Sequence, residues 1–139
     1  MIVLDTNVIS EAMSTAPHPN VARWLSAQVS TEMFTTSISL AEILYGIELL
    51  PAGKRRTRLI ASAEIMFAKL FSGRILVFDE SAARTFPRIA VDRRLRGRPI
   101  TLLDAQIAAI TRASRARLAT RNVADFEYCG IRLVNPWVD

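Results

Sequence analysis

Short apolar runs alternate with longer segments of helical periodicity along the whole chain. Apolar stretches bounded by polar or turn residues predict strands over Met1–Asp5, Met33–Thr36, Arg74–Phe78, Leu118–Thr120 and Ile131–Val134. Apolar positions repeated at three- and four-residue intervals predict helices over Thr6–Met13, Asn20–Val29, Ser37–Leu50, Lys54–Phe71, Asp79 or Glu80 to Leu95, and Leu102–Ala113. This alternation predicts an α/β fold in which helices cover both faces of a parallel sheet.

No internal repeat, low-complexity tract or linker divides the chain, so we expect a single domain over residues 1–139. The chain contains no run of about 20 apolar residues, so we expect no segment of it to span a bilayer. Asp5 interrupts the apolar start before it reaches the length of a signal-peptide core. We therefore expect a cytoplasmic protein.

Acidic residues stand in apolar surroundings at several places. Asp5 ends the first predicted strand, at the edge of a parallel sheet where ligands usually bind, and Thr120 ends another strand. Glu42 and Asp104 lie within apolar helical segments, with no lysine or arginine three or four residues away. A buried carboxylate costs several kcal/mol unless it is paired, hydrogen-bonded or bound to metal. These positions therefore favour a cation site.

The nature of that cation follows from the side chains that the chain lacks. Cys129 is the single cysteine and His18 the single histidine, which excludes an internal disulfide and a zinc cluster. Any metal must then be held by oxygen atoms. Oxygen ligands favour hard cations such as Mg²⁺ or Mn²⁺.

A purely structural interpretation of the acids remains open. Ser39-x-x-Glu42, Thr101-x-x-Asp104 and Asn122-x-x-Asp125 each have the form of a helix capping box or a variant of it, and Asp5 is placed to cap the helix that follows it. A cap contributes about 1 kcal/mol and needs no catalytic purpose. The two interpretations are compatible, because helix N-termini also stabilise ionised carboxylates.

Four segments together resemble the PIN-domain ribonucleases, and within that family the VapC-type toxins of type II toxin–antitoxin systems. They are Ile-Val-Leu-Asp5-Thr-Asn, Ser-Leu-Ala-Glu42-Ile-Leu-Tyr-Gly, Thr-Leu-Leu-Asp104-Ala-Gln-Ile-Ala-Ala and Ala-Thr120-Arg-Asn-x-x-Asp125-Phe. The terminal Asn135-Pro136-Trp137 is similar to the FitB-like subgroup. Each segment is weakly specific by itself, but four acids in this order and spacing are typical of the family.

The resemblance implies a three-layer α/β/α sandwich with a short parallel sheet and four catalytic acids, here Asp5, Glu42, Asp104 and Asp125. We expect Asp5 and Asp104 to be the principal ligands of Mg²⁺ or Mn²⁺. The polar neighbours that would orient the acids are Thr6, Asn7, Thr120 and Asn122. Asp79 matches a recurrent family residue that we interpret as a helix cap. Pro87 departs from the family pattern inside a helix, which we expect it to kink unless it lies in the first turn.

The chain carries a formal net charge of +5, and all its basic residues except Lys54 and Lys69 are arginines, which bind phosphate bidentately. Of three basic groups, the one nearest the acids in sequence is our RNA-binding candidate: Arg112, Arg115, Arg117 and Arg121. A second group runs from Arg93 to Arg98, and we interpret the third, Lys54–Arg58, as a solvated helix end.

The resemblance also implies partners: an RNA substrate, a cognate VapB-type antitoxin, a second copy of the chain in a homodimer, and a larger complex with the antitoxin on operator DNA. It implies an endoribonuclease that cleaves phosphodiester bonds with metal-activated water. The alternative is a non-catalytic PIN-like module that binds antitoxin and operator DNA and keeps its acids as helix caps.

Overall fold

Five strands form one parallel sheet in the order β3-β2-β1-β4-β5 in the computed structural model, which describes residues 1–139. The strands are β1 (Ile2–Leu4), β2 (Met33–Thr36), β3 (Ile75–Leu76), β4 (Arg117–Ala119) and β5 (Arg132–Val134). All neighbouring pairs are parallel, so their carboxyl ends meet at one edge. The register pairs Leu4 with Ala119, which places Asp5 and Thr120 side by side just beyond the two central strands.

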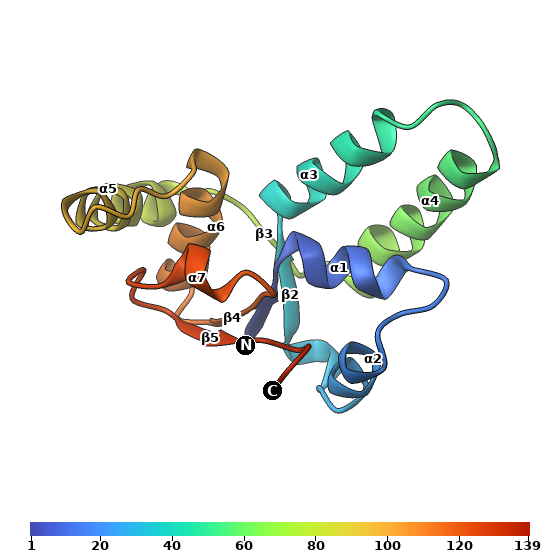
Figure 1. Cartoon of the computed structure of the whole chain (residues 1–139), viewed down its shortest axis with the longest axis horizontal. Coiled ribbons are helices and arrows are strands. Elements are labelled where there is room, and N and C mark those ends of the chain that lie inside the picture. Colours follow the sequence, from blue (N-terminus) through green and yellow to red (C-terminus); the bar gives the residue numbers. More distant parts are fainter.

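Helices cover both faces of this sheet, as the sequence predicts. They are α1 (Thr6–Met13), α2 (Pro19–Ser26), α3 (Ser37–Glu48), α4 (Lys54–Glu64), α5 (Glu80–Leu95), α6 (Leu102–Ala113) and α7 (Val123–Phe126). A 3₁₀ turn, η1 (Ser30–Glu32), precedes β2, and a π-helical stretch, η2 (Ile65–Leu70), continues α4. Figure 1 shows α1 to α4 on one side and α5 to α7 on the other, with α3 and α4 forming a hairpin that projects from the sheet. No helix has the length and apolar character needed to cross a membrane.

Alternation along β1 divides the interior into two cores. Ile2 and Leu4 belong to a cluster with buried side chains of α1, α3, α4 and η2, whereas Val3 belongs to a second cluster with side chains of α5, α6 and β4. Successive side chains of a strand point to opposite faces of a sheet, so a three-residue strand can serve both layers. The α/β/α sandwich is confirmed, and β1 lies at its centre.

Three predicted helices end earlier in the structure than expected, and one of them is α3, which was predicted to Leu50 and ends at Glu48. The helix predicted over Asn20–Val29 runs from Pro19 to Ser26, and its cap is His18, whose ring accepts a hydrogen bond from the Asn20 N–H. The Asn20 side chain instead donates to the Trp137 carbonyl at 2.7 Å, a contact 117 residues away in sequence. The longer prediction, Lys54–Phe71, is α-helical only to Glu64 and then becomes the π-helical η2.

Pro87 neither ends α5 nor lies in its first turn. It occupies the middle of the 16-residue helix, where its ring removes one backbone hydrogen bond. Pro87 is exposed, so water can satisfy the carbonyl that loses its partner. Asp79 caps this helix, since its carboxylate accepts from the Ala82 N–H at 2.9 Å.

Candidate active site

Asp5 is buried at the carboxyl end of β1, with 5% of its surface exposed. Its two carboxylate oxygens accept hydrogen bonds from the Thr6 N–H at 2.8 Å and the Thr120 hydroxyl at 2.7 Å. Burial raises the pKa of Asp5 to about 6; these two hydrogen bonds oppose the increase, and the charges of Asp104 and Glu42 add to it. Asp5 therefore caps α1, as the capping interpretation expects, and also carries a poorly compensated charge.

Asn7 and Thr120 hold the Asp5 carboxylate between the start of α1 and the loop after β4. The Thr120 hydroxyl, while donating to Asp5, accepts from the Asn122 N–H at 3.1 Å. The Asn7 amide lies 3.4 Å from both Asp5 and Thr120, and its carbonyl accepts from the Arg121 N–H at 3.1 Å. These contacts join the start of α1 to the loop after β4 and fix the orientation of the carboxylate.

Glu42 reaches the same region from α3. Its carboxylate accepts from the Thr6 hydroxyl at 2.8 Å, and that hydroxyl also lies 3.1 Å from the Ser39 hydroxyl. The capping box proposed for Ser39 and Glu42 is wrong, because Thr36 caps α3 by accepting from the Ser39 N–H at 3.0 Å. Glu42 is free of any capping role and contacts the residue next to Asp5.

Asp104 lies in the first turn of α6 and is half-buried. Thr101 caps this helix by accepting from the Asp104 N–H at 3.3 Å, as the motif predicts. Burial raises the pKa of the Asp104 carboxyl; the interaction of the Thr101 side chain with the carboxylate lowers it, the charge of Asp125 raises it, and that of Arg93 lowers it. Asp104 and Asp5 are therefore both acids whose ionised forms lack full compensation.

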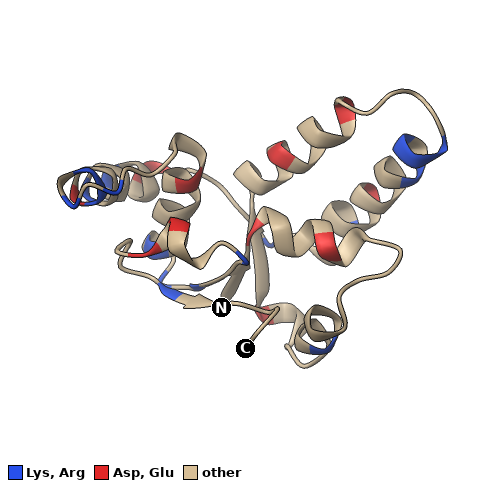
Figure 2. Ribbon diagram, viewed as in Figure 1, with Lys and Arg blue, Asp and Glu red and all other residues tan.

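A polar cleft with a volume of about 450 Å³ brings three of the four predicted acids together. Its lining comes from β1, α1, α3, α6, the loop after β4 and the C-terminal segment: Asp5, Thr6, Asn7, Ser10, Glu11, Glu42, Asp104, Arg121, Asn122 and Trp137. Figure 2 shows acidic positions on α1, α3, α6 and α7 around the centre of the molecule. Glu11 is an acid that the sequence does not single out; its carboxylate also accepts from the His18 N–H at 2.8 Å.

Asp125 does not line this cleft. It is exposed on α7, a helix of only four residues, and its charge acts on Asp104 rather than on Asp5. Asn122 occupies the N-cap position of α7, but its side chain makes no capping hydrogen bond. The acid that the motif places last is therefore peripheral to the cleft.

Comparison with known proteins places the chain in a family. The sequence profile of the PIN domain matches residues 2–127. The chain belongs to the PIN-domain family. It is 37% identical to the VapC ribonuclease Y4jK of Sinorhizobium fredii over 99% of this chain and 98% of that protein. It is 35% identical to Toxin FitB of Neisseria gonorrhoeae, with both chains covered completely.

A solved structure agrees with this assignment. The structure of FitAB bound to an IR36 DNA fragment matches the PIN domain described above with a TM-score of 0.92 and 35% identity, covering 99% of this chain and 96% of that one. The resemblance inferred from the four acidic segments is confirmed. What these relatives bind or cleave is a property of those proteins.

The carboxylates fit a hard divalent cation by their chemistry. Every candidate ligand in the cleft is an oxygen atom, and the charges of Asp104 and Glu42 add to the effect of burial in raising the pKa of Asp5. No three acidic side chains lie close enough together to chelate one ion in this arrangement. The donor set therefore fits a hard cation by its chemistry alone.

The four arginines considered for RNA binding are dispersed in this fold. Arg121 alone lines the cleft, with its guanidinium 5.2 Å from the centre of the Trp137 ring. Arg112 lies in the last turn of α6, about two helical turns from Asp104. Arg115 and Arg117 lie at the amino end of β4, where the Arg117 N–H donates to the Met1 carbonyl, at the opposite edge of the sheet.

Arg93 is a structural residue that sequence analysis places in an exposed basic run. It is 4% exposed, and its guanidinium donates to the carbonyls of Arg98 at 2.7 Å, Asp125 at 2.6 Å and Glu127 at 3.1 Å. It therefore attaches the segment that carries Asp125 to the end of α5. No local sequence signal separates it from its exposed neighbour Arg94.

Replacing Arg93 with methionine is expected to lower the free energy of unfolding by about 2–4 kcal/mol, because the buried guanidinium is lost and three partly buried carbonyls lose a charged donor. Urea denaturation measures the change. Arg94→Met, an exposed change on the same helix, is the control and should alter stability by less than about 0.5 kcal/mol. Equal stability of the two variants would contradict the assigned role.

Proposed function

We propose that this PIN-domain protein is a Mg²⁺- or Mn²⁺-dependent endoribonuclease and the toxin of a toxin–antitoxin pair, acting in the cytoplasm. The observation that carries the proposal is the polar cleft into which β1, α3 and α6 each bring one acid, Asp5, Glu42 and Asp104. Such a cluster of poorly compensated carboxylates is costly without a cationic ligand. Similarity to a VapC ribonuclease over 99% of the chain supports RNA as the substrate.

Asp5 and Asp104 are the proposed ligands of the cation. A divalent ion bound there would lower the pKa of the attacking water and neutralise charge that develops on the phosphate and the leaving oxygen. Asn7, Thr6 and Thr120 hold the Asp5 carboxylate in one orientation, so little reorganisation is needed when a ligand arrives.

Glu42 is the proposed group that orients the water and accepts its proton. It is fixed by the Thr6 hydroxyl and does not cap a helix, so its second oxygen can accept a further hydrogen bond. Asp125 contributes from the periphery by its charge on Asp104. Thr6 and Asn122 line the cleft beside these acids and complete its polar wall. By the family resemblance the products carry 5′-phosphate and 3′-hydroxyl ends.

The partners proposed from the sequence are retained: a VapB-type antitoxin, a second copy of the chain and operator DNA. The structure of FitAB on a DNA fragment, which matches this chain at 35% identity, supports a partner protein and a DNA-bound complex. Exposed apolar side chains on and just after α3, Leu44, Tyr45 and Leu49, offer surface for a protein interface.

The test is cleavage of single-stranded RNA by the purified protein with Mg²⁺ or Mn²⁺ and, in parallel, with excess chelator. We expect cleavage with metal, at least a hundredfold loss with chelator, and recovery when metal is restored. End labelling of the products checks for 5′-phosphate ends. Chelator-resistant cleavage would exclude the metal mechanism, and the absence of cleavage on every RNA class would favour the non-catalytic alternative.

A further inference from the structure

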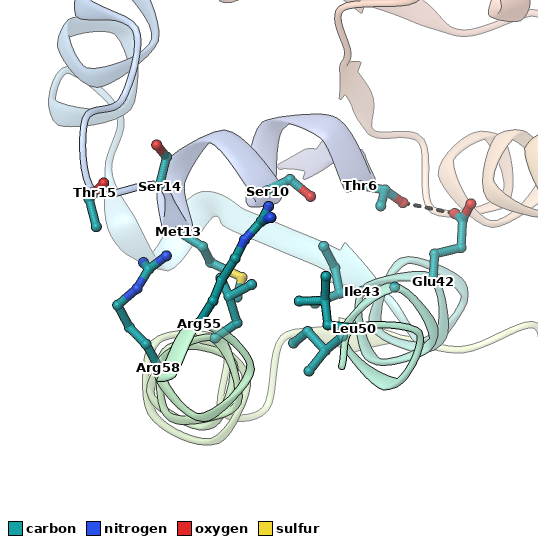
Figure 3. A pocket seen from close by; sticks show the side chains of 13 residues that line it. Thr6, Ser10, Met13, Ser14, Thr15, Glu42, Ile43, Leu50, Arg55 and Arg58 are labelled. Carbon is teal, nitrogen blue, oxygen red and sulfur yellow. Dashed lines mark hydrogen bonds between the residues drawn. The ribbon is translucent and has the colours of Figure 1, made fainter. Parts of the chain in front are cut away.

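A groove adjoins the acidic cleft on the side of the α3–α4 hairpin. Its volume is about 370 Å³, and it lies between α1, α3 and α4. Thr6, Ser10 and Glu42 line both the groove and the cleft, so the two are continuous. Figure 3 shows the Thr6–Glu42 hydrogen bond at one end of the groove and two arginines of α4 at the other.

The rim of the groove combines cations with hydroxyl groups. Figure 3 shows Arg55 extending toward Ser10, and Arg58 on the side of Ser14 and Thr15. Neither guanidinium forms a salt bridge or hydrogen bond within the protein. Their neighbour Arg56, by contrast, pairs with Glu48 at 3.1 Å. Arginine guanidinium groups and Ser or Thr hydroxyls are both among the side chains that contact nucleic-acid phosphates.

The interior of the groove is apolar. Its hydrophobic lining is Met13, Ile43, Ile47, Leu50 and Leu59. An apolar floor below a cationic rim complements a nucleotide, which has an apolar base face and an anionic phosphate. An inorganic anion would use only the rim, and an apolar peptide would use only the floor.

The position of the groove relative to the acids determines which nucleotides it can receive. Ser10 and Ser14 lie about one and two helical turns from Thr6, or about 6 and 12 Å along α1. The acids repel the phosphates of any strand that enters the cleft, so cations beside the cleft are needed to hold the strand there. Arg55 and Arg58 provide that charge on one side, and Arg121 lines the cleft itself.

We propose that this groove binds the nucleotides of the RNA substrate that flank the cleaved bond, with Arg55 and Arg58 on their phosphates. This inference rests on the proposed function, because it assigns a subsite to that substrate. It also replaces the interpretation of Lys54–Arg58 as a solvated helix end.

The test compares wild type with the double variant Arg55→Ala/Arg58→Ala. Arg84→Ala/Arg88→Ala is the matched control, because it removes the same charge from exposed positions of α5 on the other side of the sheet. Binding of a fluorescent single-stranded RNA is measured by anisotropy in chelator at several salt concentrations. The groove variant should bind about tenfold more weakly, and its plot of log affinity against log salt should be less steep by about 1.4, or 0.7 for each lost phosphate contact.

Cleavage with metal provides an independent readout. The groove variant should raise KM while kcat stays within about threefold, because these contacts hold ground state and transition state alike. Urea denaturation should show both double variants as stable as wild type. If the groove variant shows the less steep dependence of affinity on salt but none of the proteins cleaves RNA, the groove is supported as an RNA site and the proposed function is overturned.

An affinity and salt slope equal to those of the control variant would overturn the inference. If the groove variant also failed to bind a co-expressed VapB-type antitoxin, the two arginines would belong to a protein interface instead. Because binding is measured in chelator, a change in binding is distinguished from a failure of catalysis.

Discussion

Asp104→Asn is expected to lower metal-dependent RNA cleavage about a thousandfold while the protein remains folded. Loss of a principal cation ligand removes several kcal/mol of transition-state stabilisation, and each 1.4 kcal/mol corresponds to a factor of ten in rate. The helix should tolerate the change, because Thr101 caps it through the Asp104 N–H and not through the carboxylate. The neutral amide also removes the repulsion with Asp125.

The control for this prediction is Asp79→Asn. Asp79 is also an aspartate at the start of a helix, and asparagine can keep its hydrogen bond to the Ala82 N–H. Single-turnover cleavage rates at saturating Mn²⁺ measure the effect, with circular dichroism as the check on folding. An Asp104→Asn rate within tenfold of the control would remove Asp104 from the catalytic group and weaken the assignment of the cleft.

Asp5→Asn is expected to abolish cleavage and yet stabilise the metal-free protein at neutral pH. Burial raises the pKa of Asp5 from 3.8 to about 6, so the folded state binds this proton more tightly than the unfolded state does. Stability from this group is therefore fully present below about pH 4 and is lost as pH rises to about 6. At neutral pH the raised pKa of Asp5 lowers the free energy of unfolding by about 3 kcal/mol. Asparagine removes the charge but alters the hydrogen bond with Thr120, so the variant should be more stable by only about 1–2 kcal/mol.

Urea denaturation in chelator at pH 5 and pH 7.5 measures this effect. Asp5→Asn should be the more stable protein at pH 7.5, and its advantage should shrink at pH 5. Added Mn²⁺ should stabilise wild type but not the variant, since a ligand stabilises only the state that binds it. The control is Asp139→Asn, a change at an exposed carboxylate near the C-terminus. A variant less stable than wild type at both pH values would show that the Asp5 charge is compensated in the fold.

Local sequence was sufficient where the physical cause is itself local. The apolar run before Asp5 predicts a central buried strand, and β1 pairs with both β2 and β4. Thr101 and Asp104 predict a capped helix, and α6 begins and ends where the periodicity places it. The start of α6 depends on a hydrogen bond within one turn, and the strand depends on a short run of apolar side chains, so a few neighbouring residues carry the information.

Features that depend on residues far apart in the chain were less accessible. The Asn20 side chain donates to the carbonyl of Trp137, which is 117 residues away, and His18 caps α2. Arg93 has the same local setting as its exposed neighbours, yet it is buried against the segment around Asp125. The four arginines are close together in sequence but lie at opposite ends of β4, because this strand separates Arg115 from Arg121.

The same distinction between local sequence and tertiary structure applies to the four acids. The sequence alone determines that Asp5, Glu42 and Asp104 stand in apolar settings without local charge partners, and the family motif adds Asp125. Only the tertiary structure decides that the first three share one cleft and that Asp125 stays outside it. It also shows that Glu42 does not cap a helix, and it places two arginines of α4 in the groove beside that cleft. The reason is physical: apolar periodicity acts over one helical turn, whereas the convergence of charges depends on how parallel strands and helices pack across the whole chain.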